Sequence, residues 1–68
     1  MTFGDKLRGL RQAKKIPAKR LAIETKIPLA TLYRYEGDCE YPSMKRFGKI
    51  CQSLDVTPAE FMIGVSIE

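Results

Sequence analysis

The stretch Ala18–Tyr35 reads AKRLAIETKIPLATLYRY and decides the fold. Its large apolar residues fall into two groups at helical spacing, one on each side of a turn. Two helices that cross at roughly 90–120° touch near their connecting turn, where only a small side chain fits. Ala22 supplies that side chain, so we predict a helix-turn-helix. The residues predicted to be buried in it are Leu21, Ala22, Ile27, Leu32 and Tyr35.

The second helix of this unit has a face that the apolar pattern leaves uncovered. Residues opposite the buried side of an amphipathic helix point away from the helix that it packs against. We therefore expect four side chains to form a binding surface on the outside of the molecule. They are Leu29, Ala30, Tyr33 and Arg34.

The length of 68 residues fits one small domain, which we assign to residues 1–63, followed by a short tail at 64–68. The chain has no histidine, and Cys39 and Cys51 are twelve positions apart without a CxxC motif. It offers no paired acid and base, no activated nucleophile and no glycine-rich phosphate loop. We therefore expect that the protein is not an enzyme and that it binds no metal ion and no cofactor.

The cysteines also bear on the compartment. Cys51 falls on the apolar side of a predicted helix as a core residue, and Cys39 falls in a polar loop as a free thiol. Two unmatched thiols favour a reducing, intracellular location. The sequence shows no N-terminal signal segment and no apolar run of about 18 residues. We expect a cytoplasmic protein that neither leaves the cell nor spans a membrane.

The net charge of +4 is unevenly distributed. Residues 1–35 contain nine basic and two acidic residues, giving +7, whereas residues 36–68 contain three basic and six acidic residues, giving −3. A basic half that carries the expected binding surface favours a polyanion such as nucleic acid. The alternative is a lysine-rich surface that is only solvated.

Start and stop signals divide the chain into five helices. Thr2 with Asp5 resembles a capping pair, and Ser43 is a candidate cap. Thr57 and Glu60 repeat the capping pattern around a proline. The predicted helices cover about residues 3–14, 18–25, 28–36, 44–54 and 58–63.

Two positions stand out at the helix ends. Lys26 occupies the turn between the second and third helices, where glycine is usual because the chain needs a positive φ. A lysine there costs about 1 kcal/mol. Gly64 ends the last helix, and the tail Val65–Glu68 alternates apolar and polar residues, a pattern more typical of a strand than of a helix.

A set of residues at specific spacing runs through most of the chain. Its members are Leu10, Arg11, Leu21, Ala22, Ile27, Thr31, Leu32, Arg34, Tyr35, Glu36, Pro42, Ser43, Phe47, Ile50, Leu54 and Val56. This set resembles the Cro and phage-repressor class of DNA-binding domains, the XRE family, over about residues 3–63. The resemblance implies an all-α, compact five-helix, lambda-repressor-like domain. Such domains bind double-stranded operator DNA, commonly as two-fold dimers, with the third helix in the major groove.

The resemblance implies a role for each residue that matches a functional position of the family. Leu29, Ala30 and Arg34 match positions that contact base edges, and Tyr33 stands beside them. Arg34 would read a guanine, whereas Leu29 and Ala30 would contact thymine methyl groups. For Arg34 the alternatives are a phosphate contact or a salt link to an acidic neighbour.

Arg11 and Glu36 match a pair that in related repressors forms an internal ion pair between the first helix and the end of the third. We assign this pair to the architecture, because a buried charge is costly without its partner. Thr31 either touches a phosphate or packs against the second helix.

Four positions depart from the family pattern. Ala18 replaces a glutamine that usually contacts phosphate, and Lys26 replaces the turn glycine. Pro17 and Pro28 stand where serines usually start the second and third helices. Phosphate anchoring then falls to other residues. The expected phosphate contacts are Lys19, Arg20, Lys26, Pro28, Thr31, Tyr41 and Lys45.

The C-terminal residues present apolar groups that a core of this size leaves uncovered, which usually marks an interface. A dimer formed there would place two reading helices about 34 Å apart and predicts a palindromic operator. The alternative is that Phe61 and Met62 complete the core of the monomer. The expected dimer residues are Phe61, Ile63, Val65 and Ile67.

The sequence favours a sequence-specific transcriptional regulator that represses by occluding a promoter and takes no small-molecule ligand. The alternative is a protein-interaction module on the same fold, antirepressor-like or antitoxin-like, whose apolar third helix binds a partner protein. Pro28, Leu29 and Ala30 favour this alternative. The basic bias and Arg34 favour DNA.

Overall fold

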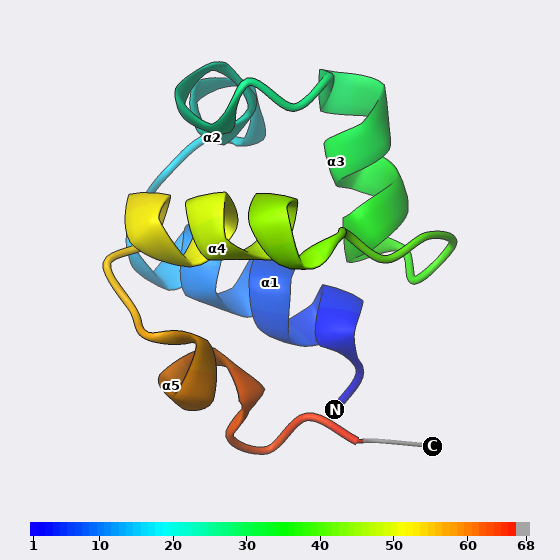
Figure 1. The fold of residues 1–68 in the computed structure, drawn as a ribbon, viewed down its shortest axis with the longest axis vertical. Helices are drawn as coiled ribbons and strands as arrows, with labels where there is room; N and C mark the ends of the chain where they lie inside the picture. Colours follow the sequence, from blue (N-terminus) through cyan, green and yellow to red (C-terminus); the bar gives the residue numbers. More distant parts are fainter. Residues whose placement is uncertain (67–68) are drawn as a thin grey trace.

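The chain is described over residues 1–66 by a computed structural model, and these residues form five α-helices and no strand (Figure 1). The predicted all-α, five-helix fold is confirmed. The helices are α1 Phe3–Ala13, α2 Ala18–Thr25, α3 Leu29–Glu36, α4 Met44–Ser53 and α5 Pro58–Met62.

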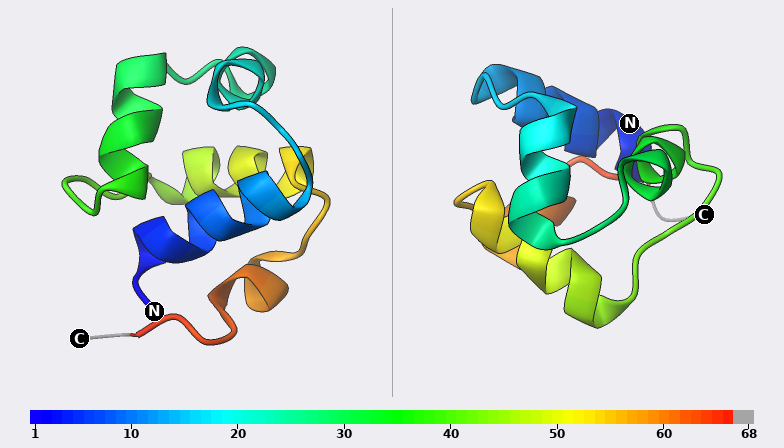
Figure 2. Two further views of the ribbon diagram at one scale, coloured as in Figure 1. Left: turned by 180° about the vertical axis from the view of Figure 1, so that it is seen from behind. Right: turned by 90° about the horizontal axis from the view of Figure 1, so that it is seen from above.

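The helices are arranged so that α3 lies at the outside of the molecule. In Figure 1 and in the left view of Figure 2, α2 and α3 lie at one end and α5 at the other, with α1 and α4 between them. α3 packs on α1 and α2, while α2 also packs on α4, and α5 contacts both α1 and α4. Every helix therefore packs against at least one other helix that is distant in the sequence.

All five helices contribute to one core. Phe61 is fully buried and forms an aromatic cluster with Phe3 and Phe47, whose ring centroids each lie 5.0 Å from its own. Aromatic pairs at this separation stabilise a core beyond the area that they bury. The buried apolar residues are Leu7, Ile16, Ala18, Leu21, Ala22, Ile27, Leu32, Tyr35, Phe47, Ile50, Cys51, Leu54 and Phe61.

The predicted helix caps are confirmed. The Thr2 hydroxyl accepts a hydrogen bond from the Asp5 amide at 3.1 Å, and the Asp5 carboxylate accepts one from the Thr2 amide. Thr57 forms the same reciprocal box at the start of α5, and Ser43 caps α4. Each cap satisfies an amide that has no partner within its helix.

Six of the ten predicted helix boundaries match the structure, and the other four differ by a single residue. Pro28 is the N-cap of α3 rather than its first residue, because its ψ of 140° is extended. α1, α4 and α5 each end one residue earlier than predicted, because Lys14, Leu54 and Ile63 are the C-caps of these helices. Lys26 adopts the predicted left-handed conformation, with φ 58°.

The tail folds back along the start of the chain. Gly64 has φ +82°, and the Ser66 amide then donates a hydrogen bond of 2.8 Å to the Met1 carbonyl. Residues 65 and 66 do not form a strand, contrary to the prediction for the tail. The Met1 ammonium also donates to the Gly64 carbonyl at 3.3 Å, but all these bonds involve Met1 alone, and pairing with one residue does not make a ladder. Ile67 and Glu68 lie outside the described residues. No helix among residues 1–66 has the length and apolar character needed to cross a membrane.

Candidate nucleic-acid interface

α2 and α3 form the predicted helix-turn-helix, with their axes steeply crossed (Figure 2). Ala22 is 7% exposed and Ile27, in the turn, is 3% exposed. The end of α2 is fixed by Thr25, whose buried hydroxyl donates a hydrogen bond of 2.7 Å to the Leu21 carbonyl. This bond lies within α2, whereas the burial of Ala22 and Ile27 keeps the helices closely packed around the turn.

One side of α3 is buried and the other faces solvent. Leu32, Tyr35 and Glu36 are buried against the rest of the chain. The predicted binding surface is open: Leu29 is 36% and Tyr33 54% exposed. Ala30 and Arg34 are exposed as well. No segment of residues 1–66 therefore covers this face of α3.

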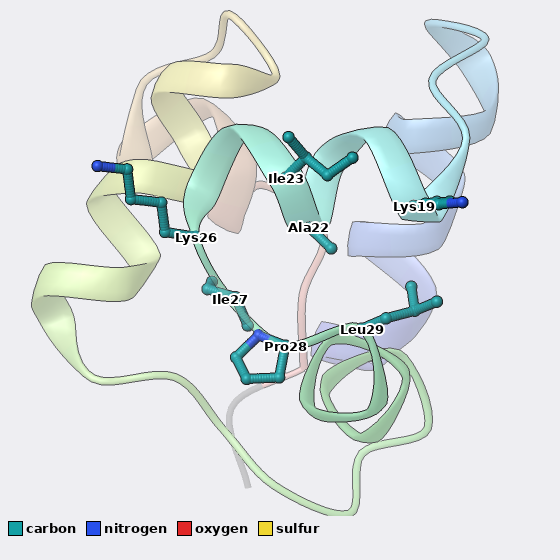
Figure 3. A pocket seen from close by; sticks show the side chains of 7 residues that line it. All are labelled: Lys19, Ala22, Ile23, Lys26, Ile27, Pro28 and Leu29. Carbon is teal, nitrogen blue, oxygen red and sulfur yellow. The ribbon is translucent and has the colours of Figure 1, made fainter.

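Four basic residues predicted to contact DNA lie on or near α3. Two of them flank a hollow beside this helix, and the other two pair with acidic residues. Lys19 and Lys26 lie at opposite ends of a hollow of about 410 Å³ that Leu29 also lines (Figure 3). Arg20 forms an exposed ion pair with Glu24. The Arg34 guanidinium lies 4.0 Å from a carboxylate oxygen of Glu40 in the loop after α3. Exposed pairs of this kind contribute little to stability and exchange readily with other ions.

The other predicted phosphate contacts are dispersed along the α3–α4 region. Tyr41 is 63% exposed, and its ring packs edge-on against Phe3 at 5.8 Å. Pro28 and Lys45 are exposed, while Thr31 is half-buried on the side of α3. All the predicted phosphate contacts are thus at least partly accessible to solvent. Only Lys19, Lys26 and Pro28 lie around the same hollow.

Arg11 and Glu36 form the ion pair that the resemblance implies. Nε and Nη2 of Arg11 donate to the two carboxylate oxygens of Glu36 at 2.6 and 3.1 Å, and Nη1 donates to the Ile16 carbonyl. Both side chains are largely buried. The hydrogen bonds to Glu36 raise the pKa of Arg11. This bidentate pair ties the end of α3 to α1.

Comparison with protein families identifies the fold and its class. The Cro/C1-type HTH DNA-binding domain matches residues 6–65, which is most of the chain. The chain belongs to this family. Its members bind DNA and are not enzymes, so the chain is a DNA-binding regulator that acts on double-stranded DNA. No curated protein shows significant similarity to it.

The Cro/C1-type domain contains a contact behind α3 that sequence reasoning missed. Asp38 follows α3 in a left-handed conformation and accepts a hydrogen bond of 2.9 Å from the Gly4 amide. The Thr2 hydroxyl and the Gly4 amide together lower the pKa of this carboxylate. Asp38 therefore links the loop after α3 to the N-terminus of α1, where a negative charge is favoured.

Gly4 itself marks the closest approach between α1 and α3. A Cβ atom at this position would lie 2.2 Å from the carbonyl oxygen of Glu36. A glycine inside an amphipathic helix is a signal for such an approach, because glycine is otherwise unfavourable there. Asp38 carried no comparable signal, since its partner is 34 residues away.

The C-terminal face of the Cro/C1-type domain corrects one expected dimer contact. Phe61 is not a surface residue: its ring is fully buried between Phe3 and Phe47 and completes the core of the monomer. Ile63 is 68% exposed and Val65 is half-buried. Ile67 lies outside the described residues.

The two cysteines of the domain have the predicted environments. Cys39 is an exposed free thiol, and Cys51 is 2% exposed in the core, where burial raises the pKa of its thiol. Among residues 1–66, no three histidine, cysteine or carboxylate side chains gather as metal ligands.

Proposed function

We propose that the chain is a sequence-specific repressor that places α3 in the major groove of operator DNA. The observation that carries the proposal is the division of α3 into a buried side and an open side. Leu32 and Tyr35 anchor the helix to the core, while Ala30 and Arg34 face solvent. A helix held in this way matches the docking geometry of recognition helices, which insert an exposed face between the two backbones.

We assign contacts with bases to three residues of this face and a contact with the DNA backbone to a fourth. Arg34 donates two hydrogen bonds to N7 and O6 of a guanine, an arrangement worth about 1–3 kcal/mol of discrimination. Leu29 and Ala30 contact the methyl groups of thymines. Tyr33 lies beside them and contacts sugar or phosphate. Glu40 releases Arg34 when a guanine takes its place, because their pairing is long and exposed.

Phosphate contacts position the domain on the duplex. Lys19, Lys26 and Lys45 are exposed and form no ion pair among residues 1–66. Each phosphate that such a residue neutralises lowers the logarithm of the binding constant by about 0.9 per tenfold increase in salt. The remaining proposed contacts are Arg20, Pro28, Thr31 and Tyr41.

We propose that two copies bind together through their C-terminal faces. Ile63 is 68% exposed and Met1 60% exposed, and Val65 adds to the apolar surface that they present. A two-fold axis through this surface would set the two α3 helices about 34 Å apart, one turn of DNA. The operator would then be palindromic, and occupancy would block a promoter that overlaps it.

Selection of bound fragments from a random duplex pool tests this proposal. We expect a palindromic consensus with a guanine at one position of each half-site. Arg34→Ala should relax the preference at that base pair alone, whereas Lys19→Ala should weaken binding to all sequences alike. Lys49→Ala on α4 is the control, because this exposed lysine lies outside the proposed contacts.

Failure to enrich any sequence, together with no binding to random duplex at low salt, would overturn the proposal. It would favour the protein-interaction module instead. The exposed apolar surface of Leu29 and Tyr33 is the observation behind that alternative.

A further inference from the structure

The hollow beside α3 has an apolar surface that no other part of residues 1–66 covers. Ile23 borders it on α2 and is 69% exposed, and Leu29 borders it at the start of α3 (Figure 3). Ala22 and Ile27 lie between them and are themselves buried. Clustered apolar side chains on a protein surface usually mark an interaction site. We call this surface, from Lys19 to Leu29, the α2 groove.

The charges around the α2 groove are positive and unpaired. Lys19 lies near the start of α2 and Lys26 is the residue that follows its last turn, so the two are seven residues apart, with Ile23 between them in the sequence (Figure 3). Seven residues of helix span about 10 Å. Neither lysine forms an ion pair within residues 1–66, whereas the neighbouring Arg20 is paired with Glu24. The groove thus combines one apolar contact point with a cation on either side of it.

We propose that the α2 groove binds a polypeptide segment of a partner protein that carries an apolar side chain flanked by carboxylates. A helix with an apolar residue at its centre and carboxylates one turn before and after matches the order of Lys19, Ile23 and Lys26 along α2 and its C-cap. The apolar residue of the segment packs against Ile23 and Leu29. The carboxylates pair with the two lysines.

Other occupants fit the α2 groove less well. All residues around it come from positions 19–29, so it has no opposite wall and cannot enclose a small molecule. A nucleic-acid backbone would pair with Lys19 and Lys26 but would leave Ile23 facing phosphates and water. Only a partner with both apolar and acidic groups satisfies the whole surface.

The occupied groove competes with DNA, a consequence that rests on the proposed function. Lys19 and Lys26 are proposed phosphate contacts, and Leu29 is a proposed base contact. A segment that pairs with both lysines removes two cations from the DNA footprint. By linkage, each ligand weakens the other by the same factor.

The probe for this proposal is a synthetic helical peptide about four turns long, with one leucine flanked on the same face by a glutamate one turn before and one turn after. Control peptides replace the leucine with serine or the glutamates with lysines. Backbone amide shifts of the isotopically labelled chain, recorded without DNA, should change at residues 19–29 with the probe and with neither control. Shift changes confined to other residues would overturn the proposal. So would the absence of any shift change at a large excess of peptide.

Ile23→Ser supplies the matched variant. Ile23 is exposed, so the substitution leaves the core intact, and this residue is outside the proposed DNA contacts. We expect it to weaken peptide binding about tenfold or more, since the apolar contact is lost. Met44→Ser, at another exposed apolar residue, should have no effect. Equal peptide binding by parent and Ile23→Ser would overturn the assignment of the groove.

Competition is measured separately, by titrating the peptide into the complex of the chain with DNA. The peptide should displace DNA from the parent but not from Ile23→Ser, which should bind DNA as the parent does. If the peptide binds at residues 19–29 but does not displace DNA, the proposed competition is wrong. If the parent chain binds no DNA at all, the proposed function is wrong, but the mapping of the peptide site by amide shifts remains valid. Self-association that Ile23→Ser abolishes would identify a second copy as the occupant, against the proposal.

Discussion

Gly4 is the residue at which one added methyl group has the largest expected effect. Its Cβ would lie 2.2 Å from the Glu36 carbonyl oxygen, so α1 would have to move away from α3. We expect Gly4→Ala to lower the free energy of unfolding by about 1–3 kcal/mol. Chemical denaturation measures this change.

Gly9 provides the matched control for Gly4. It lies in the same helix, and a Cβ there would meet no atom within 4 Å. Gly9→Ala should therefore raise the free energy of unfolding by about 0.5–1 kcal/mol. Equal effects at the two positions would contradict the close approach of α1 to α3.

Lys26 holds a conformation that its side chain disfavours. Its φ of 58° belongs to the left-handed region, where glycine has no steric penalty. We expect Lys26→Gly to raise the free energy of unfolding by up to about 1 kcal/mol. The same change at Lys19, in the first turn of α2, should lower it by up to about 1 kcal/mol. Thermal denaturation of both variants at one pH separates the two effects.

Between elements, the Arg11–Glu36 pair is the strongest polar link from α1 to α3. Breaking a buried pair leaves one charge without its partner, so Glu36→Gln or Arg11→Met should lower the free energy of unfolding by about 3–5 kcal/mol. Arg20→Met, which breaks the exposed pair with Glu24, should change it by less than about 1 kcal/mol. Denaturant titration of the three variants makes the comparison, and similar losses would contradict the burial of the Arg11 pair.

The link between Asp38 and the start of α1 predicts a dependence of stability on pH. The Thr2 hydroxyl and the Gly4 amide lower the pKa of Asp38 in the folded chain. Its contribution is therefore complete above the ordinary carboxyl pKa and is lost as the pH falls through the lowered value. We expect Asp38→Asn to be less stable than the parent at neutral pH and to approach it in acid. A difference that stays constant with pH would contradict this link.

The helices themselves could be predicted because their signals are local. Apolar spacing placed α2 and α3, and the caps at Thr2, Ser43 and Thr57 placed the starts of α1, α4 and α5. The contact of Asp38 with Gly4 could not be predicted, because a hydrogen bond between distant residues leaves no periodic signal. Phe61 was assigned to the dimer face because its apolar character is the same whether it meets its own core or a second copy.

At the scale of the whole molecule, the candidate site was predicted in part. Helical periodicity was sufficient to predict that Leu29, Tyr33 and Arg34 would be exposed. The α2 groove was not predicted. Ile23 reads as one apolar residue within an amphipathic helix, and its exposure depends on how α2 packs on α3 and α4.

The C-terminal face leads to a prediction about assembly. Ile63 is 68% exposed, so a charge there would not disturb the fold. If this face joins two copies, Ile63→Lys should shift the chain to monomers in sedimentation and weaken binding to a palindromic site more than to a half-site. Met44→Lys, at a residue 81% exposed on α4, is the control and should leave both unchanged. A parent chain that sediments as a monomer at all concentrations would contradict the proposed dimer.

The turns after α1, α2 and α4 each contain a residue other than glycine at positive φ: Lys15, Lys26 and Asp55. Lys26 is a proposed phosphate contact and would stay unchanged. Glycine at Lys15 and Asp55 would raise the free energy of unfolding by about 1–2 kcal/mol in total, because the steric crowding is relieved. Natural proteins of this size tolerate few destabilising changes. A chain strengthened at these turns could therefore accept several unfavourable side chains on α3, which makes the scaffold suitable for retargeting to new DNA sequences.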